Sequence, residues 1–355
     1  MTRRTLAFVL IAAAIVPLAA FRQSARAGSA HSGYSVNQEN GIVQLEDRSA
    51  GIRVSILPSV GNIAFEMLVR GQNILHWPYA STDAFTAKPG MSGIPFMGPW
   101  ANRLDEQAFY ANGTRYAFDM SLGNVRGAIP IHGFLTTTDR WQVVEAKTDA
   151  TAAWTTSRLE FFKQPVWMKQ WPFAHTIDMT YRLRNGSLEV RTTITNMAAE
   201  PMPIAVGFHP YFRLPDASRD DWRLSLGART HWLLAPTKLP TGETEPMAPA
   251  LAEAAGAPLR SLDLDDVYAD LVRDARGVAR MTLRGRSQRL DVDLDPQFKA
   301  VVIWAPAQSP FMCIEPMAGV TNALNLAQRG RYSELQSVAA GAKWQASFWV
   351  TPSGF

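Results

Sequence analysis

Cysteine is almost absent from this sequence. Cys313 is the only one among 355 residues, which excludes an intrachain disulfide and any zinc site built from several cysteines. Charged residues are also scarce, at 19%, and the excess of basic residues lies at the start of the chain. Residues 1–27 contain four arginines and no acid, and without them 31 basic side chains face 31 acidic ones. The charge balance therefore gives no reason to expect nucleic-acid binding.

The first apolar run is too short to span a membrane. Leu6–Ala20 is 15 residues long, whereas a membrane-spanning helix needs about 20. Arg3 and Arg4 precede the run, and Ala25-Arg26-Ala27 is a small-residue cleavage signal. We therefore predict a signal peptide over residues 1–27 in preference to an uncleaved anchor, and a soluble periplasmic or secreted protein without a membrane partner. The arginine pair is also a partial match to a twin-arginine signal, so the export route stays open.

Long amphipathic helical patterns are absent, which argues against alternating strand–helix units. In their place, apolar and polar residues alternate with a period of two. The clearest case is His175–Leu183, followed by Asn185-Gly186 and a second alternating segment, Leu188–Ile194. Asn-Gly tolerates positive φ at both central positions of a tight turn, so this pattern predicts a β-hairpin.

Further segments have the same strand character, and Gly, Pro and Asn mark the turns between them. The pattern is typical of an all-β protein, a large antiparallel β-sandwich or barrel. No linker or internal repeat divides the chain. We predict a flexible N-terminus over residues 28–40 and a single β domain over residues 41–355. The other predicted strands are Ile52–Leu57, Ile63–Val69, Trp141–Ala146, Met281–Arg284, Leu290–Leu294, Ala300–Trp304 and Trp344–Val350.

Two of the six histidines stand out from the others by their surroundings. His132 lies between Pro130 and Gly133, as in an exposed turn, and His209 is flanked by aromatic residues at the end of a strand. His175, by contrast, has the parity of the buried face of its strand, and we interpret it as a packed, hydrogen-bonded residue. Glu315 is a carboxylate in an apolar strand that we expect a proline to end. Such an acid is costly unless it is paired or functional.

Four motifs follow one another along the chain: Trp100-Ala101-Asn102-Arg103, Ile131-His132-Gly133, Gly207-Phe208-His209-Pro210-Tyr211-Phe212 and Cys313-Ile314-Glu315-Pro316. Their order resembles that of the aldose 1-epimerase (galactose mutarotase-like) family. The resemblance covers most of the chain from about Gly41 onward.

This sequence differs from the galactose enzymes of the family at several positions. It has Phe134 where they have a second glycine, and Met317 where they commonly have glutamine. It also lacks a histidine after Asp265-Asp266. We expect these differences to alter the rim of the substrate site.

The resemblance implies a β-supersandwich whose groove holds a sugar. It implies Glu315 as the general base and His209 as the general acid of an aldose 1-epimerase, an isomerase. The remaining implied residues contact the sugar. They are Asn102, Arg103, His132 and Asp265, with Asp266 as the alternative aspartate.

These residue types suit the interconversion of sugar anomers. A carboxylate with an ordinary pKa near 4.3 can accept the proton of the C1 hydroxyl, and a histidine with an ordinary pKa near 6.5 can protonate the ring oxygen. Such a reaction needs neither a cofactor nor a metal. Trp77, Trp100, Phe208 and Trp304 are candidates for stacking on a sugar, although we expect most of them in the core.

Other interpretations remain open at this point. The same fold could serve a non-catalytic carbohydrate-binding protein. A glycoside hydrolase or lyase is a second alternative, and hydrolysis would require two carboxylates, for which Asp265 and Glu315 are the pair to test. Asp291–Asp295 resembles a calcium-binding run, but its acids alternate with apolar residues and Pro296 replaces the loop glycine, so we favour an exposed strand face.

Overall fold

The predicted hairpin forms two neighbouring inner strands of the largest sheet in the computed structural model, which describes residues 33–355. His175–Arg184 and Ser187–Asn196 pair along their whole length, and Asn185 and Gly186 both have positive φ, 49° and 73°. Apolar residues of the first strand are buried and the polar residues between them are partly exposed. The hairpin prediction is confirmed. The predicted signal peptide, residues 1–27, lies outside the described residues.

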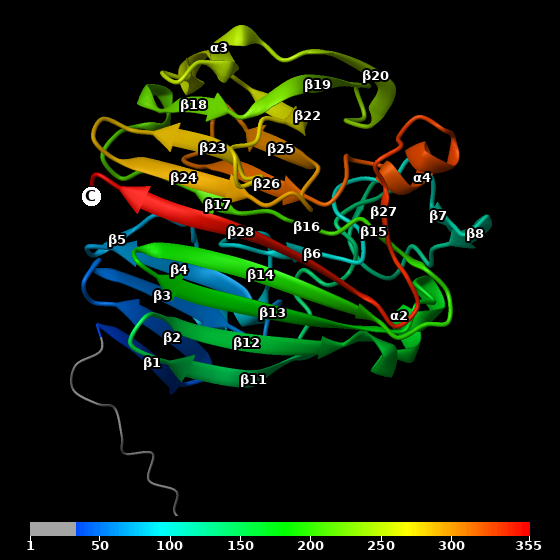
Figure 1. Ribbon diagram of the computed structural model, residues 1–355, viewed down its shortest axis with the longest axis horizontal. Helices are drawn as coiled ribbons and strands as arrows, with labels where there is room; N and C mark the ends of the chain where they lie inside the picture. Colours follow the sequence, from blue (N-terminus) through cyan, green and yellow to red (C-terminus); the bar gives the residue numbers. More distant parts are fainter. Residues whose placement is uncertain (1–32) are drawn as a thin grey trace, which may run out of the picture. The chain divides into compact units, whose positions relative to one another are not determined.

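Two large antiparallel sheets and a smaller third one make up the described fold (Figure 1). The nine-stranded sheet has the order β11 (Trp141–Thr148), β12 (Ala153–Glu160), β13 (His175–Arg184), β14 (Ser187–Asn196), β28 (Lys343–Ser353), β24 (Arg289–Leu294), β23 (Ala279–Arg284), β18 (Arg223–Leu226) and β21 (Ala257–Pro258). The eight-stranded sheet has the order β20 (Pro240–Pro246), β19 (Ala228–Leu234), β22 (Leu264–Leu271), β25 (Ala300–Ala305), β26 (Met312–Met317), β16 (Gly207–Phe208) and β6 (Phe96–Met97), with β17 (Tyr211–Phe212) also paired to β26.

The smaller elements complete the chain. The five-stranded sheet contains β1 (Tyr34–Glu39), β2 (Ile42–Asp47), β3 (Ile52–Leu57), β4 (Ile63–Val69) and β5 (Gln72–Asn73). Three strand pairs are β7 (Ala108–Ala111) with β8 (Thr114–Ala117), β9 (Val125–Arg126) with β10 (Ile129–Pro130), and β15 (Met202–Ile204) with β27 (Gln336–Val338). The helices are short: α1 (Thr82–Ala87), α2 (Pro165–Gln170), α3 (Pro249–Ala252), α4 (Ala323–Gln328), and the 3-10 turns η1 (Phe161–Lys163), η2 (Arg219–Asp221) and η3 (Leu259–Ser261). Within residues 33–355, every helix is too short or too polar to cross a bilayer.

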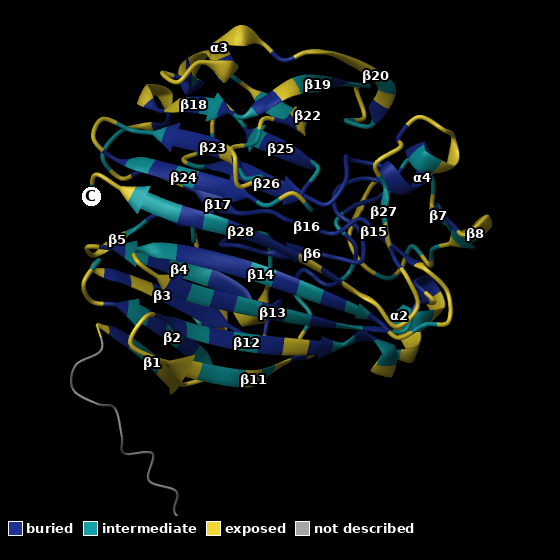
Figure 2. Ribbon diagram, viewed as in Figure 1, coloured by how far each residue is buried: buried dark blue, intermediate teal, exposed yellow. Residues whose placement is uncertain are grey.

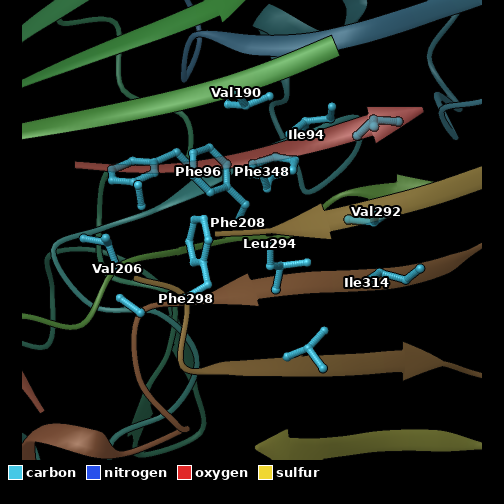
Figure 3. Close-up of a cluster of buried hydrophobic side chains, with 14 of the residues drawn as sticks. Ile94, Phe96, Val190, Val206, Phe208, Val292, Leu294, Phe298, Ile314 and Phe348 are labelled. Carbon is cyan, nitrogen blue, oxygen red and sulfur yellow. The ribbon is translucent and has the colours of Figure 1, made fainter. Parts of the chain in front are cut away.

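The main core lies between the two large sheets. Figure 3 shows Phe348 of β28 and Leu294 of β24 in one cluster with Phe208 and Ile314, which belong to the eight-stranded sheet. Phe208 and Phe348 are in direct contact, with ring centroids 4.9 Å apart. In Figure 2 the inner strands are largely buried, whereas exposed residues gather in the outer loops and at edge strands such as β1 and β11. An all-β sandwich is therefore confirmed.

The folded domain starts earlier than predicted. Residues 28–40 were expected to be flexible, but Tyr34–Glu39 form β1, which pairs with β2 from Tyr34 opposite Asp47 to Glu39 opposite Ile42. The prediction is wrong for residues 33–40. The Tyr34 hydroxyl accepts a hydrogen bond from the backbone N–H of Asn185 at 2.9 Å. Asn185 lies 151 residues from Tyr34 in the sequence. Because the contact is so distant and β1 itself is polar, the local sequence gave no sign of the strand.

Candidate active site

All six predicted site residues line one cavity of about 340 Å³. They come from five separate segments of the chain, and the sheets bring them together. The stacking candidate Trp304 lines the same cavity, as do several residues without a predicted role, among them Met91, Asn124, Arg126 and Tyr211. The six predicted residues are Asn102, Arg103, His132, His209, Asp265 and Glu315.

Strand β26 places Glu315 in the cavity because successive side chains of a strand point to opposite faces. Ile314 belongs to the main core, whereas Met317 belongs to a second, smaller apolar cluster on the other face of the sheet. Glu315 shares that second face and lies opposite Val302 of β25. Both faces are covered, so Glu315 is only 1% exposed. The strand continues one residue beyond Pro316, so the expectation that this proline ends it is wrong.

Pro210 positions His209. Proline has no backbone N–H, and the strand pairing is interrupted between β16 and β17, where His209 and Pro210 lie. The backbone N–H of His209 donates to the Pro95 carbonyl at 3.0 Å, and that of Tyr211 donates to the Gly93 carbonyl at 2.8 Å. The ring of His209 stacks on that of Tyr211, with centroids 4.7 Å apart. His209 is therefore fixed by backbone bonds on both sides and by an aromatic neighbour.

Two loops with left-handed backbone hold the first histidine. Asn102 and His132 have φ of 56° and 60°, which is uncommon for residues other than glycine. The Asn102 carbonyl accepts the backbone N–H of His132 at 2.9 Å and so ties the loops together. Gly133, also at φ 60°, lies so close to Gly98 that a Cβ atom would approach its carbonyl oxygen to 2.0 Å. Only glycine fits there, which explains the Ile-His-Gly motif.

Glu315 and His209 form a close pair in the cavity wall. Nε2 of His209 lies 3.3 Å from Oε1 of Glu315. Oε2 of Glu315 and Nδ1 of His209 are buried and have no hydrogen-bond partner, and the same is true of Nδ1 of His132. The rings of the two histidines are perpendicular, with centroids 5.3 Å apart. Three buried polar atoms are thus left for a ligand to satisfy.

Burial shifts both members of this pair toward their neutral forms. Loss of water raises the pKa of Glu315 well above its usual range, and the charge of Asp265 raises it further while Arg103 lowers it. Burial lowers the pKa of His209 to about 3, and the cationic Arg103 and Arg126 contribute to the decrease. The pKa of His132 is also lowered, by burial first and then by the charges of its neighbours. The ordinary pKa values expected from sequence therefore do not apply to the free site.

Arg103 and Asp265 form a second pair. Nη2 of Arg103 donates to Oδ2 of Asp265 at 3.1 Å, and Nη1 donates to the side-chain oxygen of Asn102 at 3.0 Å. Of the two candidate aspartates, Asp265 is the one at the cavity. Asp266 accepts instead from Nε2 of His231 at 3.1 Å. The ambiguity between these neighbours is resolved because adjacent strand residues face opposite sides of the sheet.

Aromatic residues supply part of the cavity wall, but mostly not those singled out from sequence. Of the four candidates, Trp304 lines the cavity, opposite Asp265 in the β22–β25 pairing. Trp100 and Phe208 are buried in the main core, and Trp77 packs beside a third apolar cluster. Tyr211 lines the cavity and lies within a motif that had been noted without assigning it a role.

The acidic run 291–295 pairs with basic side chains. Nε of Arg280 donates to Asp293 at 2.7 Å, and Nε of Arg289 donates to Asp291 at 2.8 Å. Both aspartates lie on β24, as expected for a strand, but their face is not exposed as predicted, because Asp293 is only 9% exposed. Across residues 33–355, no group of three or more His, Cys, Asp or Glu side chains is arranged to hold a metal ion.

The arrangement of the sheets is that of the galactose mutarotase-like fold. A galactose mutarotase-like protein from Clostridium acetobutylicum has a TM-score of 0.79 at 20% identity, covering 91% of this chain and 98% of its own. The galactose 1-epimerase of Lactobacillus acidophilus NCFM has a TM-score of 0.69 at 15% identity, covering 90% and 98%. A putative aldose 1-epimerase from Escherichia coli K12 has a TM-score of 0.64 at 17% identity, covering 86% and 97%.

The sequence itself defines the family within this fold. Residues 58–351 match the sequence model of the family described as Aldose 1-epimerase. The chain therefore belongs to the aldose 1-epimerase family, an isomerase family whose substrates are small sugars.

Proposed function

We propose that this protein interconverts the α and β anomers of an aldose by general acid–base catalysis. The observation that carries the proposal is the buried Glu315–His209 pair, 3.3 Å apart, with an unpaired polar atom on each residue in a sugar-sized cavity. A carboxylate and an imidazole at one site can move two protons without a metal or a redox group.

The reaction balances without any consumed partner. The Glu315 carboxylate takes the proton of the C1 hydroxyl while the His209 imidazolium protonates the ring oxygen, and the bond between C1 and the ring oxygen breaks. The resulting aldehyde rotates about C1–C2 and the ring oxygen attacks its other face. The two protons then return by the same routes, so the enzyme ends each cycle as it began.

Burial favours the neutral carboxyl and the neutral imidazole in the free site, whereas the proposed step starts from the carboxylate and the imidazolium. Transfer of one proton from the Glu315 carboxyl to Nε2 of His209 interconverts the two forms. The two atoms lie 3.3 Å apart, just beyond the usual hydrogen-bond length, so they have to approach slightly for the transfer. Sugar hydroxyls that donate to Glu315 would favour the charged form, because hydrogen bonds to a carboxylate lower its pKa.

The remaining polar residues are suited to holding the sugar. Arg103 has its guanidinium fixed by Asp265 and Asn102, so it can donate to a hydroxyl without losing much conformational freedom. His132 offers an unpaired Nδ1, and Trp304 offers an aromatic face. If residues 1–27 act as the predicted export signal, the reaction takes place in the periplasm or outside the cell.

Hydrolysis is less well supported by the same geometry. It would need a second free carboxylate beside Glu315, and Asp265 is engaged by Arg103 at 3.1 Å. A non-catalytic sugar-binding protein would use the same cavity without needing the acid–base pair.

Polarimetry of freshly dissolved α-D-glucose, α-D-galactose and a wider aldose panel tests the proposal. We expect the purified protein to speed the approach to equilibrium rotation, and Glu315→Gln and His209→Gln to abolish this effect. His231→Ala is the matched histidine control, because His231 lies outside the cavity and pairs with Glu245 and Asp266. Absence of acceleration on every sugar, with binding detected by tryptophan fluorescence, would replace the proposal with the binding-protein interpretation.

A further inference from the structure

One charge in the cavity wall has no counter-charge. The positive charge of Arg103 is compensated by Asp265, and burial favours the neutral forms of Glu315 and His209. Arg126 also lines the cavity, and within residues 33–355 its side chain makes no hydrogen bond and no ion pair. Other exposed arginines of the same region are paired, such as Arg115 with Glu106 at 3.3 Å.

The backbone of Arg126 is held in place although its side chain is free. Arg126 lies on β9 and pairs with Ile129 of β10, on a hairpin that closes at Gly127 with φ 63°. The segment before the hairpin is fixed by Asn124, whose Nδ2 donates to the Gly133 carbonyl and the Thr136 hydroxyl, each at 3.2 Å. The far side is fixed where the N–H of Ile131 donates to the Asn124 carbonyl at 3.1 Å. The backbone therefore keeps Arg126 beside the cavity, within reach of a ligand bound there.

Arg126 acts on one side of the acid–base pair. The segment that carries it is hydrogen-bonded to the His132 loop, because the backbone N–H and Nδ2 of Asn124 both donate to the Gly133 carbonyl at 3.2 Å. The ring of His132 in turn lies 5.3 Å from that of His209. In agreement with this placement, the charge of Arg126 adds to the effect of burial in lowering the pKa of both histidines. In the proposed reaction Glu315 faces the C1 hydroxyl and His209 faces the ring oxygen. Arg126 is therefore nearer to the ring-oxygen side, where the substituent on C5 of a pyranose lies.

We propose that the physiological substrate is an aldose with an anionic group on the carbon attached to C5, and that Arg126 binds this group. The inference rests on the proposed function and specifies its substrate class. A guanidinium binds carboxylate and phosphate through paired N–H donors, so a uronic acid and a sugar 6-phosphate share the required chemistry. A neutral aldose leaves the charge at the cavity mouth unmatched.

A selectivity ratio measures the proposed contact. It is kcat/KM for anomer exchange of the acidic sugar divided by kcat/KM for the parent aldose, with galacturonate against galactose and glucuronate against glucose. The 6-phosphates of the same aldoses form a second arm, which distinguishes carboxylate from phosphate. We expect Arg126→Gln to lower the ratio about tenfold, as for loss of one charge-assisted hydrogen bond. Raising the ionic strength should lower the ratio in the wild type and leave it unchanged in Arg126→Gln.

Arg184→Gln is the matched control. Arg184 is also exposed and unpaired within residues 33–355, but it lies at the end of β13, away from the cavity lining. The inference is overturned if neither acidic series is preferred over the parent aldoses, or if both variants change the selectivity ratio equally. The proposed function would survive either result.

Tryptophan fluorescence gives a second readout, sugar binding, that does not depend on turnover. If acidic sugars bind more weakly to Arg126→Gln but not to Arg184→Gln, the result supports an anion-binding role of Arg126 even if no sugar is isomerised. If Arg126→Gln binds acidic sugars as tightly as the wild type, the inference is overturned.

Discussion

Two buried histidines of this protein have opposite surroundings. His175 lies inside the nine-stranded sheet at 2% exposure and His209 lies in the cavity wall at 6%. Burial lowers the pKa of both, to about 4 and about 3. Nδ1 of His175 donates to the Phe173 carbonyl at 2.7 Å, and its ring stacks on Phe161 with centroids 4.2 Å apart. His209 has an unpaired Nδ1, and its Nε2 faces a carboxyl group.

The comparison separates a structural polar group from one that is available for chemistry. In the core around His175, the Tyr181 hydroxyl donates to the Asn62 carbonyl at 2.8 Å, and Nδ2 of Asn196 donates to the Val338 carbonyl at 2.9 Å. Single unpaired atoms also occur in the nine-stranded sheet, such as Nε1 of Trp141 and Oγ1 of Thr192. At the cavity, by contrast, three such atoms lie together, on His132, His209 and Glu315. Such atoms reduce stability. They also provide hydrogen-bonding groups already in position for a substrate.

The largest expected difference between the two regions is in activity. Glu315→Gln should lower kcat for anomer exchange about 10²–10⁴-fold, the usual contribution of a positioned general base. His175→Asn, which retains an N–H near the position of Nδ1, should leave kcat per folded molecule within about twofold of wild type. Polarimetry measures kcat of both variants, and circular dichroism measures the folded fraction needed to express kcat per folded molecule. A comparable loss in both variants would remove the distinction between the two regions.

The two faces of β26 give the next largest contrast. Ile314 is fully buried in the main core, one residue before Glu315. Ile314→Ala should reduce the free energy of unfolding by about 3 kcal/mol, because it removes buried methyl groups and leaves a cavity. Glu315→Gln should not reduce it. Urea denaturation of both variants measures the contrast, and a small cost at Ile314 would mean that the core between the sheets is loosely packed.

A pH-dependent loss of stability should follow from His175. At pH 7 this histidine is neutral in the folded and the unfolded chain. At pH 5 the unfolded chain binds a proton and the folded chain does not, so stability present above about pH 6.5 is lost as the pH falls toward 4. The resulting loss in the free energy of unfolding between pH 7 and pH 5 is about 2 kcal/mol. Denaturation at both pH values should show that His175→Asn loses about that much less than wild type; equal losses would contradict burial of the neutral ring.

The smallest expected effect is a gain in stability at Glu315. Its pKa is raised in the folded protein, so the unfolded chain is favoured as the pH rises above the ordinary value near 4.3. Glu315→Gln removes this titration and should raise the free energy of unfolding more at pH 8 than at pH 5. Thermal unfolding of wild type and variant at pH 5 and pH 8 tests it. A variant that is destabilised at pH 8 would show that the carboxyl group contributes to holding the fold.

Much of the fold was accessible from sequence because its signals are local. The alternation in β13 and β14 and the Asn185-Gly186 turn were sufficient for the central hairpin. Where stability comes from distant contacts, the sequence was misleading. β1 is polar, and its Tyr34 is anchored by the remote Asn185. Ala248–Pro258 contains one short helix, α3, and the edge strand β21, which the Ala/Pro-rich composition does not distinguish from a loop.

The candidate site shows the same division. Motif order, through a family resemblance, was enough to name six residues that the structure brings to one cavity. The pKa shifts of Glu315 and His209 depend on burial by strands far apart in the sequence, so ordinary values were assumed. Arg126 was missed because a single arginine in a glycine-containing turn has no distinguishing pattern. Its only sequence signal is its place between Gly123 and Gly127, shortly before the Ile131-His132-Gly133 motif.

A double-mutant cycle on Glu315→Gln and His209→Gln tests the central claim, that these two residues act as one proton-transferring unit. Anomer exchange would be followed by polarimetry for the wild type, each single variant and the double variant. The account predicts that the double variant loses about as much activity as either single variant, because neither residue works without the other. Losses that multiply in the double variant would mean that the two residues act independently, and would contradict the shared-proton mechanism.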